Sequence, residues 1–491
     1  MIDIIAVKNR MLEIAVHGNL VPHYSDDKPM QDILANIREK RNEKIKSGQT
    51  KQPKEKPMST DEIFDIPDSW TWVALGDLCL LISRGKSPQY SDVPKYPVFA
   101  QKCNQPHQLA LEKALFLDEK TLAKWPEYFR LQDEDIVINS TGTGTMGRVG
   151  YYDSTKLPKK YPFMVPDSHI SLLRLGEGIV AKYIYYALRS PSIQKLMFKQ
   201  FRGSTNQREY YIDSVYATPV PIPCTAEQKA IADKLDQIYG VLDIIDAAQE
   251  QYAADAESLK AKLITLGIQG RLTEQLESDG TAEELYQQIQ AEKQRLIKEG
   301  KIKKEKPLPE IKPEEVPFEI PGNWKWVRAG NVFVIGTGVT PLKSEKKYYN
   351  EGNIPWVTST LTTNRYISET QTYITEYALN TLNLKLYPVH TLIIAMYGEG
   401  KTRGQISELL IPATTNQACA ALVSVIYNKE TIDYMCYFFQ YFYESLRALA
   451  HGGNQPNLNL QKIKEVCIPL PPLAEQKRIA ETLERVLGVL A

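Results

Sequence analysis

The sequence predicts a protein built from two copies of one domain and a pair of long coiled-coil helices, arranged with pseudo-two-fold symmetry. Three observations predict this architecture. The same motifs occur in the same order in both halves of the chain. One long helical pattern connects the halves, and the two chain ends together repeat that pattern.

The internal repeat is clearest where each copy begins and ends. IPDSWTWV at residues 66–73 matches IPGNWKWV at residues 320–327, including both tryptophans. The tripeptide EQK occurs at 227–229 and again at 475–477. Copies of roughly 245 residues are far longer than a solenoid unit, so the repeat indicates duplication of a whole domain with its connector.

The interiors of the two copies differ although their flanks match. TGTGTMGRVGYY begins at Thr141 in the first copy, whereas the corresponding YGEGKTRGQIS begins at Tyr397 in the second. DSH at 167–169 stands where the second copy has TNQ at 415–417. This pattern favours one scaffold that carries two different recognition surfaces. Ordinary drift in loop sequences is the alternative.

Residues 225–268 are predicted to form one continuous helix. Thr225 and Gln228 have the spacing of a capping box at a helix start. Apolar residues then recur at steps of three and four, which is the a/d seam of a coiled coil. The seam consists of Ile231, Leu235, Ile238, Leu242 and Ile245 and, after a small phase slip, Tyr252, Ala256, Leu259, Leu263 and Leu266. A helix of about 65 Å needs a partner helix to bury such a seam.

The partner helix is predicted to be divided between the two chain ends. HGNL at 17–20 corresponds to QGRL at 269–272, so the first residues match the second half of the long helix, and the last residues match its first half. The repeated seam positions are Ile479, Leu483, Val486 and Leu490 at one end and Val7, Met11 and Ile14 at the other. We therefore expect the termini to lie close together in a nearly circular molecule. A core helix of a compact domain is the alternative interpretation of 225–268.

The two linkers, residues 21–65 and 273–319, resemble each other. Each contains a short amphipathic, charged helical pattern followed by a Lys/Pro-rich tail, KQPKEKP from Lys51 and KIKKEKPLP from Lys301. Prolines end a helix, and lysines keep a segment solvated. A solvated face is the simpler interpretation of these charges, and contact with nucleic acid is the alternative.

The composition is that of a globular protein with balanced charge. With 59 basic and 59 acidic residues the net charge is zero. Because DNA-binding proteins are usually basic, a DNA-binding function requires local positive charge or help from partner subunits. Six cysteines without a CxxC pair suit a reducing compartment. No secretory signal or long apolar run is evident, so we expect a cytoplasmic, prokaryotic protein.

Catalytic signatures are missing from the sequence. It contains no NPP[FY] or DPP[FY] tetrapeptide of amino-methyltransferases, no HExxH and no GxSxG, so we expect neither catalytic residues nor a metal site. AMYGEGKT at 395–402 resembles a permissive phosphate-binding loop, but no amphipathic helix pattern follows it. A glycine-rich turn that presents polar side chains to DNA is the better interpretation.

Small, polar and cationic clusters are the candidate DNA contacts, because Arg, Lys, Gln and Asn side chains read base edges and phosphates. In the first copy the candidates are Arg84, Lys86, Thr143, Thr145, Arg148, Arg202, Ser204, Asn206 and Arg208. In the second copy they are Lys343, Tyr397, Lys401, Thr402, Arg403, Gln405, Asn416, Gln417, His451, Asn454 and Asn457. Any one of them is equally well explained as part of a polar turn. Gln207 and Gln455 occupy equal positions in both copies and are expected to hold their loops.

Taken together, these motifs resemble the specificity subunit of type I restriction–modification systems. The resemblance covers nearly the whole chain and rests on the IPxxWxWV motif, the GxL helix end, GTGVTPLKS and GNIPWV in the second copy, TNQ, and PLPPLAEQKRIA. It implies an α+β protein in which two target recognition domains of mixed α/β fold are held apart by antiparallel helices. The first copy lacks GTGVTP and TNQ, which leaves its contact residues less defined than those of the second.

The resemblance also implies a function and partners. Each domain would read one half of a bipartite double-stranded DNA target, and the helix length would set the spacer. The helices would dock two methyltransferase subunits, and restriction subunits would join the complex. The chain itself would be non-catalytic and hold no cofactor, whereas S-adenosylmethionine, ATP and Mg would belong to the partner subunits.

The resemblance defines seven segments, all of them expectations. They are an N-terminal part of the distal helix at 1–20, a linker at 21–65, recognition domain 1 at 66–223, the central helix at 224–272, a linker at 273–319, recognition domain 2 at 320–471, and a C-terminal part of the distal helix at 472–491. Three alternatives stay open, namely a specificity subunit of a type IIB-like two-component system, a P-loop ATPase, and a coiled-coil adaptor that does not bind DNA.

Overall fold

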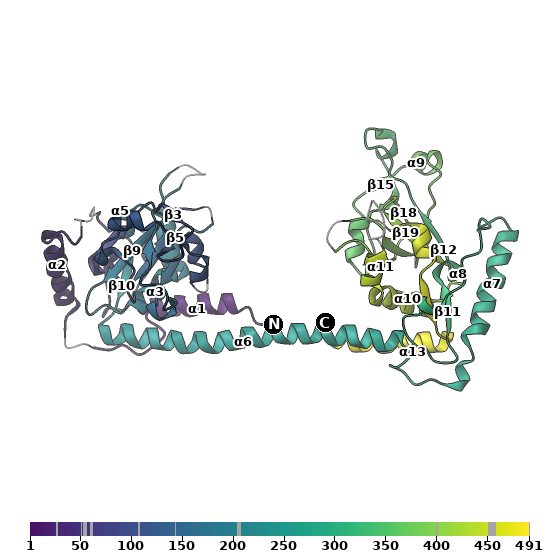
Figure 1. Cartoon of the computed structure of the whole chain (residues 1–491), viewed down its shortest axis with the longest axis horizontal. Helices are drawn as coiled ribbons and strands as arrows, with labels where there is room; N and C mark the ends of the chain where they lie inside the picture. The colour runs from purple at the N-terminus through teal and green to yellow at the C-terminus, as the bar shows by residue number, and fades with distance from the viewer. Residues whose placement is uncertain are drawn as a thin grey trace. The chain divides into compact units, whose positions relative to one another are not determined.

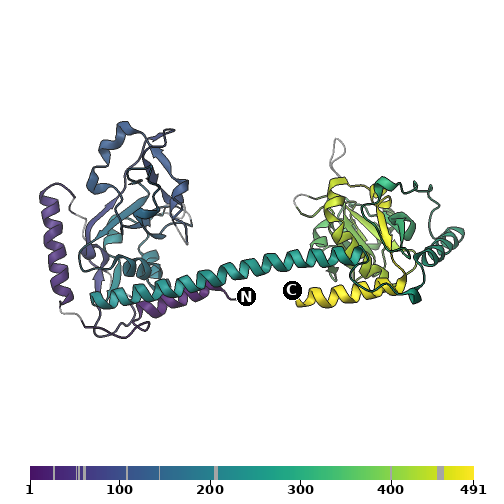
Figure 2. The same ribbon diagram turned by 60° about the horizontal axis from the view of Figure 1, so that its bottom comes forward.

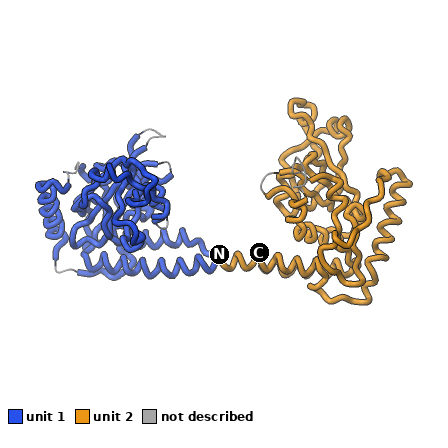
Figure 3. The backbone as a smooth tube through the Cα atoms, viewed as in Figure 1, with its two compact units in different colours: residues 1–250 blue, residues 251–491 orange. Residues whose placement is uncertain are grey.

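The computed structural model describes most of the chain as two compact units, Met1–Glu250 and Gln251–Ala491 (Figure 3). The described residues are 1–25, 28–50, 52, 56–58, 62–106, 109–142, 144–203, 208–398, 401–449 and 458–490. Both units mix helices and sheets, which confirms the α+β prediction. No described helix is both long enough and apolar enough to cross a membrane.

The described part of unit 1 forms two four-stranded sheets and a two-stranded ribbon. The main sheet has the antiparallel order β2-β9-β6-β7, the second sheet has the order β3-β5-β4-β8, and β1 pairs with β10. The strands are β1 (Thr71–Ala74), β2 (Cys79–Arg84), β3 (Tyr90–Ser91), β4 (Pro97–Phe99), β5 (Leu115–Leu117), β6 (Ile136–Asn139), β7 (Val149–Tyr151), β8 (Val165–Pro166), β9 (Ile170–Leu175) and β10 (Pro219–Ile222). The α-helices are α1 (Ile4–Val16), α2 (Met30–Lys46), α3 (Ala181–Arg189), α4 (Pro191–Lys199), α5 (Ile212–Tyr216) and α6 (Thr225–Ile268), whose last residues belong to unit 2.

The described part of unit 2 repeats this plan. Its main sheet has the order β12-β19-β16-β17-β14, a smaller sheet has the order β15-β13-β18, and β11 pairs with β20. The strands are β11 (Lys325–Arg328), β12 (Phe333–Thr337), β13 (Ile354–Val357), β14 (Tyr366–Ile367), β15 (Tyr373–Ile374), β16 (Leu392–Ala395), β17 (Ile406–Leu409), β18 (Thr414–Thr415), β19 (Cys419–Ser424) and β20 (Cys467–Leu470). The α-helices are α7 (Ala282–Lys298), α8 (Ala329–Val332), α9 (Glu376–Thr381), α10 (Lys429–Tyr441), α11 (Tyr443–Leu449), α12 (Leu460–Lys464) and α13 (Leu473–Val489).

The strand pairing confirms the internal repeat. In unit 1, Trp72 of the IPxxWxWV motif lies opposite Pro221, and in unit 2 Trp326 lies opposite Pro469. Each motif therefore forms the first strand of its domain, and each proline-rich exit forms the last strand beside it. The ribbon closes each domain, because it joins the beginning of the domain to its end.

Helix α6 has the bounds predicted from the sequence, Thr225–Ile268. Its first turn is tied to the preceding domain. The Thr225 hydroxyl donates to the carbonyl of Gly178 at 2.8 Å, and the Gln228 side-chain oxygen accepts from the backbone N–H of Val180 at 2.9 Å. In the first half of the predicted seam, Ile231 and Leu235 are buried in the core of unit 1.

The two chain ends supply partner helices for α6 (Figures 1 and 2). In unit 1, the Tyr239 hydroxyl donates to the carbonyl of Lys8 at 3.4 Å and the backbone N–H of Ile2 donates to Gln249 at 2.5 Å, so α1 runs antiparallel to α6. In unit 2, Ile479 and Leu483 of α13 lie against Gly267, and Glu475 of the same helix accepts from Thr273 at 2.6 Å. Helix α13 is therefore also antiparallel to α6. That the two termini meet stays a prediction.

The structure has a helix in each linker, as the amphipathic patterns predicted, and these helices dock on their own domains. In α2, Ile33 and Ile37 are buried in the core of unit 1, and Arg41 donates to the carbonyl of Gly76 at 2.7 Å. In α7, Leu285 and Ile289 are buried in the core of unit 2. A few apolar positions in each helix carry this packing.

Candidate nucleic-acid interface

In unit 1 the predicted contact loops meet at one end of the main sheet. The Arg84 Nε donates to the carbonyl of Ser168 at 2.6 Å, which joins the end of β2 to the turn before β9. The Thr141 hydroxyl lies 2.7 Å from Nδ1 of His169, which joins the same turn to the β6–β7 hairpin. The backbone N–H of Tyr210 donates to the carbonyl of Ser140 at 2.8 Å. Segments far apart in the sequence therefore form one polar surface.

Three predicted arginines of unit 1 make internal contacts. Arg84 forms an ion pair with Glu209, and burial lowers the pKa of its guanidinium. Arg202 pairs with Asp213, and Arg148 donates to the carbonyl of Asn104 at 2.8 Å. These side chains hold the loops together in this structure, so a contact with DNA would have to replace or share their present partners.

Two other predicted cations of unit 1 are exposed. The Lys86 ammonium lies 5.1 Å from the centre of the Phe129 ring and donates to the carbonyl of Lys124 at 2.5 Å. The Arg208 guanidinium lies 5.6 Å from the centre of the Phe198 ring. Thr145 remains within the β6–β7 hairpin, with its hydroxyl 3.5 Å from the carbonyl of Gly142.

Both units use one glycine to close their interface, which the sequence analysis did not single out. A Cβ atom at Gly85 would lie 1.9 Å from the carbonyl oxygen of Asp167, and one at Gly338 would lie 1.6 Å from that of Thr415. Because no side chain fits at these distances, the chain after β2 or β12 can touch the facing turn only through glycine. The sequence signal that could have revealed this closure is that Gly85 and Gly338 occupy nearly equivalent positions in the two copies.

In unit 2 the corresponding surface is built from the β16–β17 hairpin and the turn between β18 and β19. The backbone N–H of Met396 donates to the carbonyl of Ala418 at 2.7 Å, and that of Asn416 donates to Val357 at 2.9 Å. The Asn416 side-chain oxygen accepts from the N–H of Ala418 at 3.1 Å, so this amide shapes the turn. Gln417, the next residue, is exposed.

The hairpin itself presents side chains in different environments. Lys401 is exposed, whereas Thr402, Arg403 and Gln405 are half-buried. The Arg403 Nη2 donates to the carbonyl of Gly398 at 3.4 Å. The Nε of Arg403 and the side-chain oxygen of Gln405 are buried and lack a hydrogen-bond partner within the described part of the chain. These two polar groups are therefore available to a ligand that reaches them.

The hairpin geometry excludes a phosphate-binding loop at 395–402. A helix would have to begin directly after Thr402, but the chain turns and enters β17 at Ile406. β17 then pairs antiparallel with β16, the strand from which the hairpin departs. The alternative of a P-loop ATPase is therefore wrong.

The remaining described candidates, Tyr397 and Lys343, differ in position. Tyr397 lies within the β16–β17 hairpin and packs on the core of unit 2, whereas Lys343 is exposed in the segment after β12. That segment is directed to the smaller sheet, because the Trp356 indole donates to the carbonyl of Val339 at 3.2 Å. Six predicted contact residues lie outside the described part of the chain, namely Thr143, Ser204, Asn206, His451, Asn454 and Asn457, as do Gln207 and Gln455, which were expected to hold their loops.

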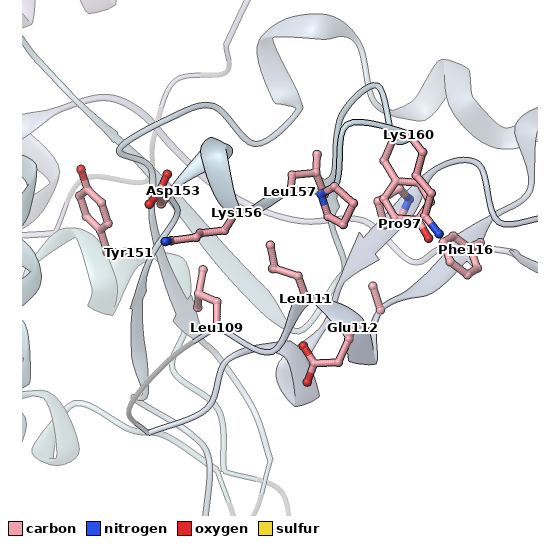
Figure 4. Close-up of a pocket in the computed structure, with 13 residues that line it drawn as sticks. Pro97, Leu109, Leu111, Glu112, Phe116, Tyr151, Asp153, Lys156, Leu157 and Lys160 are labelled. Atoms are coloured by element: carbon pink, nitrogen blue, oxygen red, sulfur yellow. The ribbon is translucent and has the colours of Figure 1, made fainter. Parts of the chain in front are cut away.

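Unit 1 also has a groove of about 720 Å³ beside its second sheet (Figure 4). Apolar side chains such as Leu111 and Phe116 line it together with Lys156, Lys160 and Glu112. Among the described residues, no group of His, Cys, Asp and Glu side chains could hold a metal ion.

Comparison with known proteins gives a consistent family match. The model of the type I restriction modification DNA specificity domain matches residues 67–251 and 321–489. The chain is 25% identical to the Escherichia coli type I restriction enzyme EcoAI specificity subunit, covering 99% of this chain and 90% of that protein. It is 26% identical to the EcoEI specificity subunit of the same organism, over 98% and 89% of the two chains.

Solved structures show the same fold. One chain comes from a study of complex assembly and conformational transition of the type I R-M system and matches with a TM-score of 0.62 and 17% identity, over 87% of this chain and 92% of that one. The HsdS subunit from Thermoanaerobacter tengcongensis matches with a TM-score of 0.50 and 16% identity, over 88% and 93% of the two chains.

Proposed function

The chain belongs to the family of type I restriction–modification DNA specificity subunits. From this premise we propose that it reads a bipartite DNA target, with the domain of unit 1 on one half-site and the domain of unit 2 on the other. One observation carries the proposal. Two units of the same fold close their loop surfaces in the same way, with Gly85 against Asp167 and Gly338 against Thr415, but present different residues there. One scaffold used twice, with different contact residues, suits a target whose halves differ.

The contact residues have the chemistry required for DNA recognition. Lys86 and Arg208 in unit 1 and Lys401 in unit 2 are exposed cations, and Gln417 is an exposed amide. Lysine and arginine bind phosphates and guanine, whereas glutamine pairs with adenine. Since the chain has no net charge, these local cations and its partner subunits together would have to offset the phosphate charge.

The chain is a non-catalytic recognition component, as the names of its relatives indicate. We propose that two methyltransferase subunits and restriction subunits join it and bring S-adenosylmethionine, ATP and Mg. Helix α6 supports such docking, because Ile244 and Tyr252 near its middle are 70% and 60% exposed. Apolar side chains that remain this exposed on a helix are typical of a surface that another protein covers.

Methylome sequencing of a host that expresses this chain with its methyltransferase subunits tests the proposal. We expect methylation at one bipartite motif whose two specific halves are separated by unspecified bases. A single uninterrupted motif would contradict the assignment of one half-site to each unit. The absence of any methylation, together with no shift of duplex DNA by the assembled complex, would favour an adaptor that does not bind DNA. A partner that fuses nuclease and methylase would identify a type IIB-like system.

A further inference from the structure

We propose that Tyr443 and Arg447 of α11 are positioning residues that hold the β16–β17 hairpin in the conformation that reads DNA. The Tyr443 hydroxyl donates to the carbonyl of Lys401 at 2.6 Å, and Arg447 Nη1 donates to the carbonyl of Arg403 at 3.2 Å. Arg447 Nη1 also lies 3.2 Å from the Tyr443 hydroxyl, so the two side chains act as one brace. This inference rests on the proposed function, because it assumes that the hairpin contacts DNA.

Two glycines explain why a brace from outside the hairpin helps to hold its conformation. Gly398 and Gly404 have φ values of 148° and 86°, in the region that favours glycine, and glycine loses more conformational freedom on ordering than any other residue. The Tyr443 ring and the aliphatic stem of Arg447 both pack on Gly404, where an added Cβ would lie 3.4 Å from each of them. Ordering the loop before DNA arrives reduces the entropy lost on binding.

The bracing bonds go to main-chain carbonyls and do not use the polar groups of the contact side chains. Lys401 stays exposed although its carbonyl is held, and the buried Nε of Arg403 lacks a partner in the described part of the chain. A brace of this kind fixes the backbone from which the contact side chains extend, without forming hydrogen bonds to their polar groups. Its loss should therefore reduce discrimination between bases more than it reduces the stability of the fold.

Unit 1 has a corresponding brace with different chemistry. Gln194 of α4 donates to the carbonyl of Gly147 in the β6–β7 hairpin at 3.1 Å, and an added Cβ at Gly147 would lie 2.9 Å from the Phe201 ring. In unit 1 the brace comes from α4, the second helix after β9, and in unit 2 it comes from α11, the second helix after β19. The two braces therefore occupy equivalent places in the repeat. Gln194 provides a matched test in the other half of the molecule.

The experiment measures binding of the full chain assembled with its methyltransferase subunits. The probes are the duplex carrying the motif found by methylome sequencing and two duplexes with a single base changed in one half or in the other. The variants are Tyr443→Phe combined with Arg447→Gln, Arg447→Lys as the conservative change, and Gln194→Ala in unit 1. Ser445→Ala, an exposed position of α11, is the control. Thermal unfolding of each complex is measured in parallel.

We expect the double variant to lose about tenfold in discrimination at one half-site only, as two lost hydrogen bonds imply, with Arg447→Lys closer to wild type. Gln194→Ala should weaken discrimination at the opposite half, and Ser445→Ala should change neither. Equal losses at both halves, or a loss matched by a lower unfolding temperature, would overturn the positioning role. If the wild-type complex discriminates at neither half, the proposed function itself fails. If it does discriminate and the double variant equals it, only the brace is wrong.

Discussion

The indole Nε1 of Trp70 donates a hydrogen bond to the carboxylate of Glu227 at 3.0 Å, which ties the first strand region of the domain to the first turn of α6. His23 lies 2.9 Å from the same oxygen, and Glu227 is only 1% exposed. In unit 2, Trp324 donates to Gln275 at 3.1 Å, and Gln275 donates to Glu475 at 2.8 Å. The repeated W and EQK motifs thus form the joint between each domain and its helix.

Removing this joint should destabilise unit 1. We expect Glu227→Ala to lower the free energy of unfolding by about 3 kcal/mol, because buried donors lose a charged acceptor. Urea unfolding measures the change in free energy, and hydrogen exchange in peptides from residues 66–83 shows whether the change lies at this joint. Glu250→Ala, at an exposed position of the same helix, is the control. Equal effects of the two substitutions would contradict the joint.

Acid should weaken the anchor of the second linker. Hydrogen bonds from Arg328 hold the pKa of Glu315 at about 2, below the usual value of 4.5. A carboxylate with a lowered pKa in the folded state stabilises it above the unfolded-state pKa and loses that contribution as the pH falls through the folded-state value. The difference in unfolding temperature between wild type and Glu315→Gln should therefore be constant at neutral pH and shrink between pH 4.5 and about 2. A constant difference over that window would contradict the pairing.

Exchanging one recognition domain should change one half of the target. Residues 66–223 replaced by the domain of another specificity subunit should alter only one half of the methylated motif, because the other reading surface stays intact. Methylome sequencing gives both halves at once. A change in both halves would refute independent modules.

Shortening α6 should change the spacer and leave the half-sites intact. Deleting residues 246–252 removes one heptad and about 10 Å of helix, which preserves the side of the seam and shortens the spacer by up to about three base pairs. The control is a variant in which residues 246–252 are replaced by other helix-forming residues, so that α6 keeps its length. An unchanged spacer in the deletion variant would exclude a ruler function.

The predicted meeting of the chain ends can be tested by crosslinking. Cysteines introduced at Ile2 and Val489 should be joined by a short bismaleimide, and mass spectrometry would identify the linked peptide. The pair Ile2→Cys and Thr273→Cys should give no such product, because Thr273 lies beyond the far end of α6. Failure of the first pair to react would disprove a closed arrangement.

The long elements were predictable because their signals are local. The seam from Ile231 onward predicted α6 to the residue, and two matched tryptophan motifs predicted the duplicated domains. The short strands were not predictable. β3 has two residues, Tyr90 and Ser91, and its pairing with β5 depends on chain segments far away in the sequence. A strand of two residues is too short to show the alternation of apolar and polar residues by which a strand is identified in a sequence.

The residue types of the candidate contacts could be chosen from the sequence but their arrangement could not, and their contact with DNA stays a prediction. Polar loops near Thr141 and Tyr397 were located from sequence differences between the copies, and the structure brings each to a surface with its neighbouring turn. The internal ion pair of Arg84 with Glu209 could not be foreseen, because the partners are distant in the chain. The bracing role of Tyr443 is likewise a tertiary contact to a backbone atom, which leaves no pattern in the sequence.

The glycine contacts have a consequence for the evolution of new specificities. Gly85 and Gly338 each approach a carbonyl oxygen, of Asp167 and Thr415 respectively. The glycine thus approaches the main chain of the facing residue, which every amino acid possesses. Asp167 and Thr415 are themselves buried, but the same turns carry exposed residues at positions 169 and 417, where substitution changes the surface while the closure persists. If these turns contact DNA, as we propose, a new target can arise from substitutions there while the fold is kept.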